Sequence, residues 1–587
     1  MALDVHSKAE DFDEKIEEEN DIDPGYFQEL VEYIKKEEPE KEELAKKKVK
    51  LCKHYDVDEI PSDIDVLMQA DEDDVPDIRE YLITKPMRTG SGVAVIAVMT
   101  KPHSCPHGKC TYCPGGPNSA FGDVPQSYTG NEPATMRGIR NDYDGYLQVM
   151  NRLEQYIAIG QCPDKIELIV MGGTFPSMSK EYQENFVRDA LQAMNDFGRE
   201  FFKGETKGYA DIDLKKFKDF FLLPGDVQDE ERGEKVKERL LKLKEENKVS
   251  LEEAQKENET ANVRCVGMTI ETKPDWGLLD HGNEMLKLGC TRVEIGVQTL
   301  FDDVLRNIHR GHGIMETIDS IQTLKDLGFK LNFHMMPGLP DVSKDMDIWC
   351  FEELFDNPKY KPDMLKIYPT MVMPGTKLYV DYKRGEFDPI GTEDASDIIA
   401  ESLKYLPRYC RIMRIQRDIP TKYSEGGVDK NNLRQLVMDK IDEKGYDLQD
   451  IKAREIGRSE IEDPVELEVI EYEASEGKEY FVSYKDAKDD LLGFVRVRLP
   501  AESLRDEITE DSALVRELHV YGNAASIGSD ESNAQHRGFG TRLMEKAEEI
   551  ATENGKEKVV VISGIGVREY YRKLGYKKEG PYMTKNV

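Results

Sequence analysis

The chain has 587 residues, of which 39% are hydrophobic and 8% aromatic, and its formal net charge is −35. One hydrophobic core does not support a chain of this length, so we expect two to four domains. No stretch approaches the roughly 20 uncharged apolar residues of a membrane span. The acidic N-terminus also lacks the apolar core of a secretory signal, so we expect a cytoplasmic protein.

The acidic balance, taken alone, argues against a polyanionic partner. Two interpretations stay open: an acidic, salt-adapted surface with local basic patches, or a protein that does not bind nucleic acid. Only three of the nine cysteines are tightly clustered. In a large intracellular chain this favours a local metal site over a disulfide framework, and we expect the other six to be small buried apolar residues.

Residues 1–80 are highly charged, and their composition predicts helices over 26–37 and 41–54. The second of these helices contains the run KKKVK. We interpret this run either as a solvated helix face or as a contact for phosphate. The region as a whole is a possible docking surface for a partner.

Short apolar runs then alternate with longer helical stretches between residues 93 and 370. This alternation indicates right-handed βαβ units and a parallel sheet. Six units predict a partial barrel over residues 81–384, with a charged surface insert at about 202–262. Active groups in such folds gather where the strands end. The six runs are 93–99, 165–173, 264–272, 291–299, 329–337 and 364–370.

The pattern changes after the barrel. Residues 385–460 are predicted to form a linker region, and from about residue 463 the apolar runs suit antiparallel strands. A helix over 538–554 and a strand over 559–564 complete a compact α+β domain at 461–587. The predicted fold class is therefore α/β: a partial six-strand barrel fused to an α+β domain.

The segment KPHSCPHGKCTYCPGGP places Cys105, Cys110 and Cys113 on the loop after the first predicted strand. Three thiolates on one loop can hold three irons of a 4Fe–4S cluster and leave the fourth iron open. An open iron can bind S-adenosylmethionine, which one electron then cleaves to a 5′-deoxyadenosyl radical. The alternative is a zinc site, which needs four ligands; His103 and His107 could donate, but they crowd the same loop.

The sequence Gly-Gly-Thr at 172–174 ends the second predicted strand. Glycines there let the backbone approach a ligand closely. We expect this turn to contact the amino group of S-adenosylmethionine, with an ordinary strand-to-helix turn as the alternative.

A second motif follows the strand ALVRELHVYG and opens a helix. Successive amides at a helix N-terminus bind anions, and small residues let a pyrophosphate approach them. This is the pattern of the acetyl-CoA loop of acetyltransferases. Tyr570 and Tyr571 follow later, either as core aromatics or as a phenol that donates a proton near the thioester sulfur. The loop residues are Gln535, His536, Arg537, Gly538, Phe539 and Gly540.

With both motifs present, the chain resembles the catalytic subunit family of Elongator, which modifies the wobble uridine of tRNA. The resemblance covers residues 60–587 and implies a radical-SAM barrel fused to a GNAT acetyltransferase domain. It rests on KPHSCPHGKCTYCPGGP, QSYTGNEP, IELIVMGGTFP, IETKPDW, CTRVEIGVQT, HMMPGLP, LKIYPTMVMPGT, RIQRDIP, AREIG, QHRGFG and VISGIGVREYYRKLGY.

The resemblance implies a reaction. Acetyl-CoA binds the C-terminal domain, and the deoxyadenosyl radical removes a hydrogen from its methyl group. The carbon radical adds to C5 of the wobble uridine, and thioester hydrolysis leaves 5-carboxymethyluridine. The implied cofactors are a 4Fe–4S cluster and S-adenosylmethionine, and the implied partners are tRNA, acetyl-CoA and an electron donor.

The resemblance also assigns residues. Cys105, Cys110 and Cys113 ligate the cluster, Lys366 lies on the acyl-CoA side of the radical site, and Tyr570 and Tyr571 lie by the thioester. The residues expected around S-adenosylmethionine are Gly172, Gly173, Glu271, Glu294, Gln298 and His334, and residues 535–540 hold the CoA pyrophosphate. The expected contacts with tRNA phosphates are Lys85, Arg88, Arg137, Arg140, Arg411, Arg414 and Arg417.

The chain departs from the family in one respect. Members often carry a cysteine just before the AREIG element at 453–457, which suggests a zinc site, whereas here only Cys410 lies nearby, so we expect no zinc. Two other hypotheses remain: a protein lysine acetyltransferase with a structural cluster, and a scaffold subunit whose activity needs partner proteins. A cluster with only a structural role, however, does not require the motifs GGT, IET and EIGVQ at consecutive strand ends.

Overall fold

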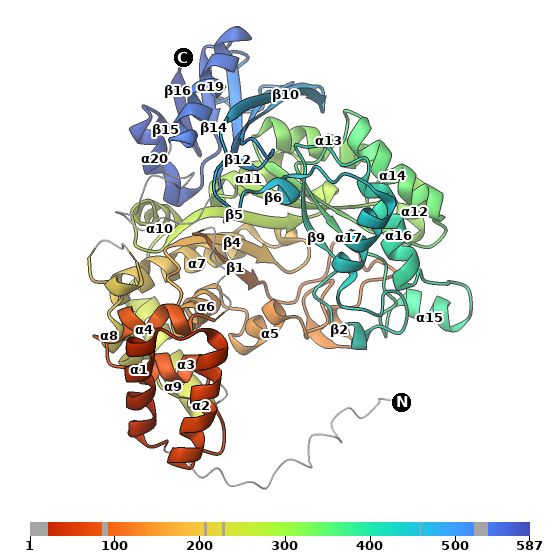
Figure 1. Ribbon diagram of the computed structural model, residues 1–587. Helices are drawn as coiled ribbons and strands as arrows, with labels where there is room; N and C mark the ends of the chain where they lie inside the picture. The colour runs from red at the N-terminus through yellow and green to blue at the C-terminus, as the bar shows by residue number, and fades with distance from the viewer. Residues whose placement is uncertain (1–21, 85–91, 205–207, 226–228, 458, 522–537) are drawn as a thin grey trace.

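The computed structural model describes residues 22–84, 92–204, 208–225, 229–457, 459–521 and 538–587. A small helical bundle comes first, followed by a barrel of parallel strands and an α+β domain that packs against the barrel (Figure 1). Within these ranges no helix has the length and apolar character needed to cross a membrane.

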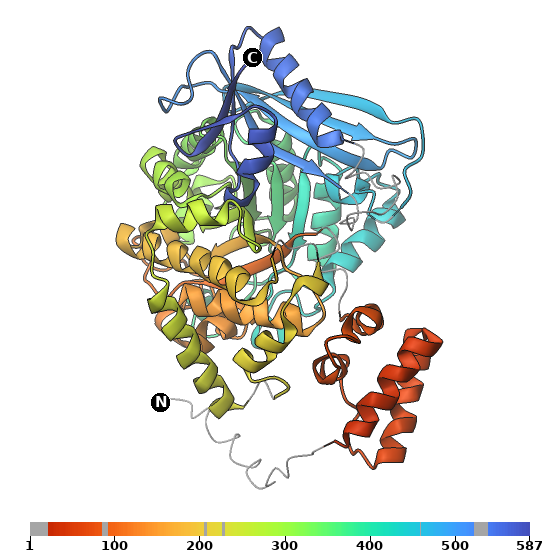
Figure 2. The same ribbon diagram turned by 90° about the vertical axis from the view of Figure 1, so that its left-hand side faces the viewer.

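The N-terminal bundle lies beside one end of the barrel, away from the C-terminal domain (Figure 2). Its first two helices confirm the two predicted ones. In the KKKVK run, the Nζ of Lys48 is buried and pairs with Oδ1 of Asp63 at 2.7 Å, so this lysine does not face a phosphate. The bundle consists of α1 (Pro24–Glu37), α2 (Lys41–Tyr55), α3 (Asp63–Gln69) and α4 (Val75–Leu82).

The barrel is a sheet of seven strands whose spatial order follows the chain and whose neighbours are all parallel. The predicted partial barrel is therefore present, and all six predicted runs form strands. A seventh strand, β9, comes from the stretch that we expected to be a linker. The strands are β1 (Ala94–Met99), β4 (Lys165–Met171), β5 (Arg264–Thr272), β6 (Arg292–Gln298), β7 (Lys330–Met335), β8 (Met364–Ile367) and β9 (Arg411–Ile415).

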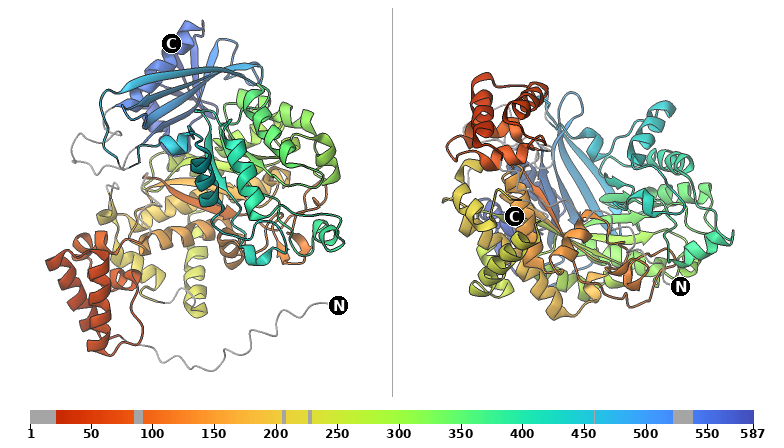
Figure 3. Two further views of the ribbon diagram at one scale, coloured as in Figure 1. Left: turned by 45° about the vertical axis from the view of Figure 1, so that its right-hand side comes forward. Right: turned by 90° about the horizontal axis from the view of Figure 1, so that it is seen from below.

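Helices cover the outer face of this sheet (Figure 3). They are α5 (Pro133–Arg140), α6 (Gly145–Ala158), α7 (Lys180–Phe201), α11 (Leu279–Leu288), α13 (Ile314–Asp326), α14 (Lys344–Asp356), α16 (Thr392–Leu403), α17 (Leu433–Lys444) and α18 (Ile451–Arg454). Two short helices, α12 (Asp302–Asn307) and α15 (Lys377–Lys383), pack instead against residues of the cysteine loop. A short hairpin, β2 (Gly116–Ser119) and β3 (Gly122–Val124), follows the cysteine loop.

The charged insert at 202–262 is more than a surface excursion. It forms α8 (Leu214–Phe221), α9 (Glu230–Glu246) and α10 (Leu251–Asn258). Phe217 and Phe221 are fully buried and pack on Phe197 and Phe201 of α7. Because apolar residues four apart share one helix face, a few of them suffice to join the insert to the core.

The C-terminal domain is a mostly antiparallel seven-stranded sheet, as predicted, in which β13 and β14 are parallel and α19 connects them. Its strands are β10 (Glu466–Ala474), β11 (Gly477–Lys485), β12 (Leu491–Leu499), β13 (Ser512–Val520), β14 (Lys558–Val561), β15 (Lys577–Glu579) and β16 (Tyr582–Asn586). The helices are α19 (Phe539–Glu553) and α20 (Arg568–Lys573).

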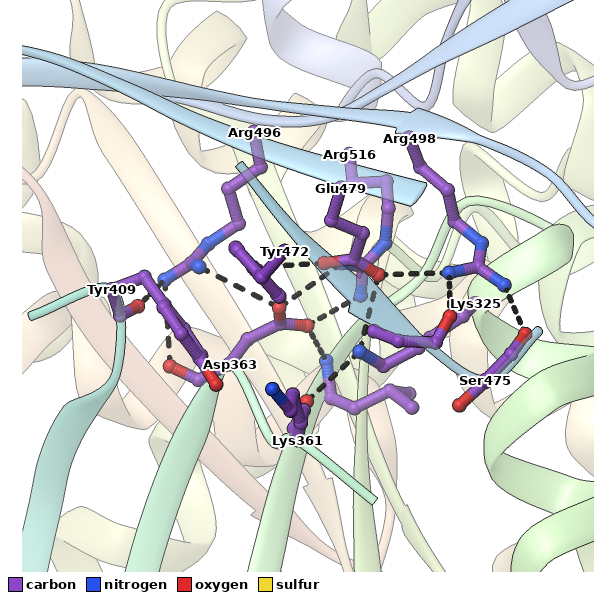
Figure 4. A network of polar contacts seen from close by, with 12 residues as sticks. Lys325, Lys361, Asp363, Tyr409, Tyr472, Ser475, Glu479, Arg496, Arg498 and Arg516 are labelled. Carbon is purple, nitrogen blue, oxygen red and sulfur yellow. Dashed lines mark hydrogen bonds and ion pairs between the residues drawn. The ribbon is translucent and has the colours of Figure 1, made fainter. Parts of the chain in front are cut away.

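The two faces of this sheet bury different chemistry. In β12, Val495 and Val497 belong to the apolar core beneath α19. Arg496 and Arg498 alternate with them and therefore point to the opposite face, toward the barrel (Figure 4). The C-terminal domain thus contacts part of the barrel through arginines and not through apolar side chains.

These arginines meet carboxylates in a buried network (Figure 4). Arg516 of β13 donates to Oδ1 of Asp363 at 3.0 Å and to Oε2 of Glu479 at 2.9 Å. Arg498 donates to Oδ1 of Asp326 at 2.8 Å. All of these side chains are at most 1% exposed, so the two domains share one set of fully desolvated charges.

We expect Asp363→Asn to lower the free energy of unfolding by about 3 kcal/mol or more, because the buried Arg496 and Arg516 each lose one of their two carboxylate partners. Urea unfolding followed by fluorescence of the two tryptophans measures this. Asp303→Asn is the matched control, since Asp303 pairs with Arg306 in an ion pair that is 87% and 74% exposed. Equal urea midpoints for the two variants would contradict the expectation.

The network also predicts acid sensitivity. Burial alone would raise the pKa of Glu479 and Glu517, but Arg516 and Lys330 respectively oppose it and hold each pKa at about 2. The unfolded chain therefore binds protons first as pH falls, and stability is lost between about pH 4.5 and 2. Urea midpoints at constant ionic strength should stay level down to about pH 5 and then fall; a midpoint unchanged at pH 3 would rule this out.

Candidate functional site

Polar side chains converge at the carboxyl ends of β5 to β8. The register of the parallel strands places Glu271 beside Glu294 and His334 beside Lys366. Glu294, 1% exposed, lies at the centre: His334 Nε2 is 2.8 Å from its Oε2, and the ammonium of Lys366 donates to the same oxygen. Four residues that the sequence analysis singled out therefore form one contiguous group.

The Glu294–Lys366 pair stays charged at neutral pH. Burial opposes ionisation of Glu294, but Lys366 and His334 hold its pKa well below the ordinary value. Burial likewise opposes the charge on Lys366, and Glu294 outweighs it, so the pKa of this lysine is raised. The ammonium thus remains a hydrogen-bond donor at the strand ends.

The three clustered cysteines lie on the loop after β1, and polar donors surround their sulfurs. The amide of Ser127 donates to Cys113 Sγ at 3.2 Å, and Thr174 Oγ1 lies 3.5 Å from Cys105 Sγ. Cys110 and Cys113 are buried, and Cys105 is half-buried. Donors placed in this way suit sulfurs that carry negative charge.

Two cations not foreseen from the sequence reinforce this environment. Arg310 NH1 lies 3.8 Å from Cys110 Sγ, and NH2 of the same buried guanidinium donates to the carbonyl of Gly296 at 2.9 Å. The Nζ of Lys273 lies 2.9 Å from Nδ1 of His107. Because an ammonium can only donate, His107 carries its proton on Nε2, which is 3.4 Å from Cys110 Sγ.

The spacing of the sulfurs distinguishes between the two metal hypotheses. Zinc with bonds of about 2.3 Å in a tetrahedral site holds its sulfurs about 3.8 Å apart. In the described part of the chain, three potential metal-ligand atoms lie within 4.8 Å of one another at Glu271, Glu294 and His334, and not at the three cysteines. The three cysteine sulfurs do not converge to that degree, which fits separate irons of a cluster better than one zinc ion.

The glycines after β4 shape the neighbouring turn. Gly172 and Gly173 have φ values of +133° and +99°. A Cβ on Gly172 would lie 2.0 Å from Oγ1 of Thr100, and a Cβ on Gly173 would lie 3.0 Å from Cβ of Gln126. Backbone conformation and space both require glycine here, so the turn is more constrained than an ordinary strand-to-helix connection.

A single open cavity, with an empty volume of about 920 Å³ that includes its mouth, joins the cysteine loop to the strand ends. Cys105 and Lys366 both line it. Further lining residues are Gly173, Thr174, Glu271, Lys273, Glu294, Gln298, Arg310 and His334. Seven of the predicted site residues of the barrel therefore line one space, namely Cys105, Gly173, Glu271, Glu294, Gln298, His334 and Lys366.

Part of the wall of this cavity is basic and aromatic. Arg417 donates to the carbonyl of Ser127 at 2.5 Å, and its guanidinium lies 5.8 Å from the ring centroid of Tyr128 and 5.9 Å from that of Tyr368. Arg414 also lines the cavity; it pairs with Asp418, but both side chains of this ion pair are open to solvent, at 43% and 50% exposed. These two arginines are the predicted phosphate contacts that lie at the site.

The remaining predicted phosphate contacts behave differently. Arg137 is buried and donates to the carbonyl of Ala97 at 2.5 Å, so it is wrong as a phosphate contact. Arg411 is also mostly buried and pairs with Glu455, which again leaves no cation for a phosphate. Arg140 is exposed. Lys85 and Arg88 lie outside the described residues.

The acetyl-CoA motif begins α19. Gly538 is the N-cap of this helix at φ +71°, and a Cβ on Gly540 would lie 2.7 Å from the hydroxyl of Tyr570. Phe539 is 1% exposed, and its ring packs on Tyr484, so only its backbone faces a ligand. Gln535, His536 and Arg537 lie outside the described residues.

The two tyrosines of α20 differ in their surroundings. Tyr570 is half-buried, and its hydroxyl lies at the start of α19. Tyr571 is 6% exposed and packs between Tyr570 and Tyr576, with ring centroids 5.3 and 5.9 Å away. Tyr570 is thus the phenol placed beside the acetyl-CoA motif, and Tyr571 belongs to the core.

Four models of known families match the chain. They are the ELP3 N-terminal domain at 26–90, the Radical SAM superfamily at 213–348, the Radical_SAM C-terminal domain at 362–443 and the Acetyltransferase (GNAT) family at 446–576. A protein of Methanocaldococcus infernus named tRNA uridine(34) acetyltransferase is 44% identical, with 95% of this chain and 98% of that one covered. The chain belongs to the Elongator complex protein 3 family. Homo sapiens Elongator complex protein 3 is 39% identical, with 92% and 93% covered.

A solved structure agrees with this family assignment. An archaeal Elp3 of Methanocaldococcus infernus with an N-terminal deletion has a TM-score of 0.67 and 40% identity, and covers 85% of this chain and all of that one. As a member of the Elongator complex protein 3 family, the chain is an enzyme with a radical SAM domain and an acetyltransferase domain. Such domains imply S-adenosylmethionine, an iron–sulfur cluster and acetyl-CoA.

We expect Gly172→Ala to destabilise the fold by about 1–3 kcal/mol, because a methyl group at this φ is strained and meets Thr100. Thermal unfolding measures the effect. Gly233→Ala is the control, since nothing lies within 4 Å of a Cβ at that position in α9, and it should leave the melting temperature equal or higher. A melting temperature of Gly172→Ala at or above that of the unmodified chain would show that position 172 does not require glycine.

Proposed function

We propose that this enzyme forms 5-carboxymethyluridine at the wobble uridine of tRNA, using acetyl-CoA and a 5′-deoxyadenosyl radical. The observation that carries the proposal is the single cavity, which is lined by Cys105 of the cysteine loop and also by Lys366, Arg414 and Arg417. A radical source and cations for an anionic substrate can therefore serve the same space. Two relatives from Methanocaldococcus species are named tRNA uridine(34) acetyltransferases, which agrees with this substrate.

The residues present fit a 4Fe–4S cluster. Cys105, Cys110 and Cys113 would hold three irons, and the bound cluster supplies the electron that cleaves S-adenosylmethionine. Arg310 offsets the negative charge of the thiolate group, because it lies buried beside Cys110. The turn at Gly172 and Gly173 is proposed to contact S-adenosylmethionine, because Gly173 and Thr174 line the cavity. Glu271, Gln298 and His334 are the proposed polar contacts around S-adenosylmethionine.

The acetyl group is proposed to enter from the side of β8 and β9. Arg411 of β9 donates to the hydroxyl of Tyr521 at 2.9 Å, just after β13, the strand that leads toward the acetyl-CoA motif. Lys366, whose charge Glu294 maintains, stands on the next strand and can hold the acetyl carbonyl. Tyr570 is the proposed proton donor to the thioester sulfur.

The proposed reaction takes up one electron, for the cleavage of S-adenosylmethionine, and releases one electron, from the nucleobase radical. A methyl hydrogen moves from acetyl-CoA to the deoxyadenosyl radical, and the carbon radical forms a bond to C5 of uridine. The nucleobase radical then loses one electron to an acceptor and the C5 proton to a base. Water adds to the thioester carbonyl, and the CoA thiolate leaves with a proton, for which Tyr570 is the proposed donor because its hydroxyl lies near Gly540.

The tRNA is proposed to approach over Arg140, Arg414 and Arg417. Binding through such cations weakens steeply with salt, because each phosphate contact releases counterions. The acidic remainder of the chain keeps nonspecific binding of polyanions low. A protein lysine acetyltransferase, the alternative considered above, needs neither the polar strand ends nor the cavity at Cys105.

We expect Cys110→Ser to abolish both 5′-deoxyadenosine formation and uridine modification, because an alcohol does not replace a thiolate ligand. Binding of acetyl-CoA should remain unchanged. The measurement uses anaerobically reconstituted protein with S-adenosylmethionine, acetyl-CoA and tRNA, and quantifies both products by mass spectrometry.

Cys162→Ser is the matched control, since this cysteine is half-buried outside the loop and should keep both activities. Uridine modification that survives Cys110→Ser would show that the radical role is wrong. Loss of acetyl-CoA binding in the same variant would instead mark a general folding defect, which thermal unfolding checks independently.

A further inference from the structure

The helix that carries Tyr570 and Tyr571 rests directly on the barrel, not only on its own domain. The preceding turn crosses β5 so closely that a Cβ on Gly564 would lie 2.0 Å from the carbonyl oxygen of Val266. A Cβ on Gly566 would lie 2.5 Å from Cβ of Arg264. The glycines of the sequence SGIG are therefore required by contact between the two domains, and the place of α20 is set from outside the acetyltransferase fold.

A single carboxylate from the barrel holds the other side of this helix. Glu259 follows α10, within the insert that precedes β5, and contacts α20; α10 and α20 lie near one another (Figure 1). Its Oε1 accepts from Arg568 at 2.9 Å, and its Oε2 accepts from Arg572 at 2.7 Å. Arg568 and Arg572 stand four residues apart on one face of the helix and bracket the two tyrosines.

The burial of this contact makes it more than a surface ion pair. The side chain of Glu259 is 9% exposed, and that of Arg568 is 3% exposed. Burial alone would raise the pKa of Glu259, but the two arginines outweigh it and lower that pKa. Removal of the charge on Glu259 leaves Arg568 buried without its carboxylate, so the helix must shift to solvate the guanidinium.

We propose that Glu259 is a positioning residue for acetyl-CoA chemistry: it fixes α20 from the barrel and so sets where the hydroxyl of Tyr570 lies against the start of α19. The inference rests on the proposed role of Tyr570. A barrel residue thereby determines whether the acetyltransferase domain is competent, and thioester cleavage proceeds only while the two domains are docked.

The test is Glu259→Gln in the full chain, with tRNA-dependent release of CoA from acetyl-CoA as the readout. Because misplacement of a proton donor affects the transition state more than the ground state, we expect kcat to fall about tenfold or more while KM for acetyl-CoA changes less than about threefold. Glu259→Asp retains the carboxylate and should recover most of the lost kcat. Cleavage of S-adenosylmethionine, measured without acetyl-CoA, should be unchanged.

Glu257→Gln is the matched control, because Glu257 lies two residues earlier and pairs with Arg199 in an ion pair that is 40% and 45% exposed. It should behave as the unmodified chain. Should Glu259→Gln not fold, the double variant Glu259→Gln/Arg568→Gln leaves no unpaired buried charge and is expected to show the same fall in kcat.

A wild-type kcat in Glu259→Gln, or in the double variant Glu259→Gln/Arg568→Gln, overturns the proposal. Equal losses of CoA release and of S-adenosylmethionine cleavage also overturn it, because Glu259 would then stabilise the whole fold and not orient one helix. Tyr570→Phe in the same assay distinguishes a failure of the proposed role of Glu259 from a failure of the proposed role of Tyr570. A fully active Tyr570→Phe contradicts the role of the tyrosine, whereas a defective Tyr570→Phe beside an active Glu259→Gln contradicts only the role of Glu259.

Discussion

The buried ion network between the barrel and the acetyltransferase sheet fixes the geometry on which the rest of the molecule depends. Arg496, Arg498 and Arg516 reach across the domain boundary to carboxylates and to main-chain oxygens at the start of the barrel strands. Desolvation of so many charges adds little net stability. It does penalise every other orientation, because any relative slip leaves a buried charge unpaired.

This constraint acts on the same strands that carry the site. Asp363 immediately precedes β8, and its carboxylate accepts from Arg516 and from the amide of Leu331 at the start of β7. Farther along these strands stand His334 and Lys366. β7 and β8 have only six and four residues, so a short stretch of strand separates their two ends. The acetyltransferase domain therefore holds one end of each strand while the candidate site lies at the other.

The sequence predicted most of the fold because the barrel strands are apolar runs between clear breaks. It did not predict β9, in which Arg411 and Arg414 interrupt a short apolar run. The alternation Val-Arg-Val-Arg in β12 suggests one solvent-exposed face, yet another domain covers that face. Strand periodicity records which side chains share a face and contains no information on what covers it.

The same limit of strand periodicity explains which residues of the candidate site could be predicted from the sequence. Glu271, Glu294 and His334 could be foreseen as neighbours, because the carboxyl ends of parallel strands meet at one edge of a sheet. Lys273 and Arg310 could not, since each follows a strand or helix on a loop whose return path no periodicity encodes. Arg137 and Arg411 were predicted as exposed cations for the same reason: residue type indicates charge, and only the tertiary structure decides burial.

The acidic composition left open whether an anionic substrate could be bound at all, and the distribution of charge resolves that physical difficulty. The net charge of −35 is spread over the whole chain, and its field is screened within about 8 Å at physiological ionic strength. A ligand in the cavity instead meets neighbouring groups at contact distance, where salt screens little. These groups include five cations, Lys273, Arg310, Lys366, Arg414 and Arg417, against the carboxylates Glu132, Glu271, Glu294 and Asp418. An acidic surface and a site for anionic substrates are therefore compatible in one chain.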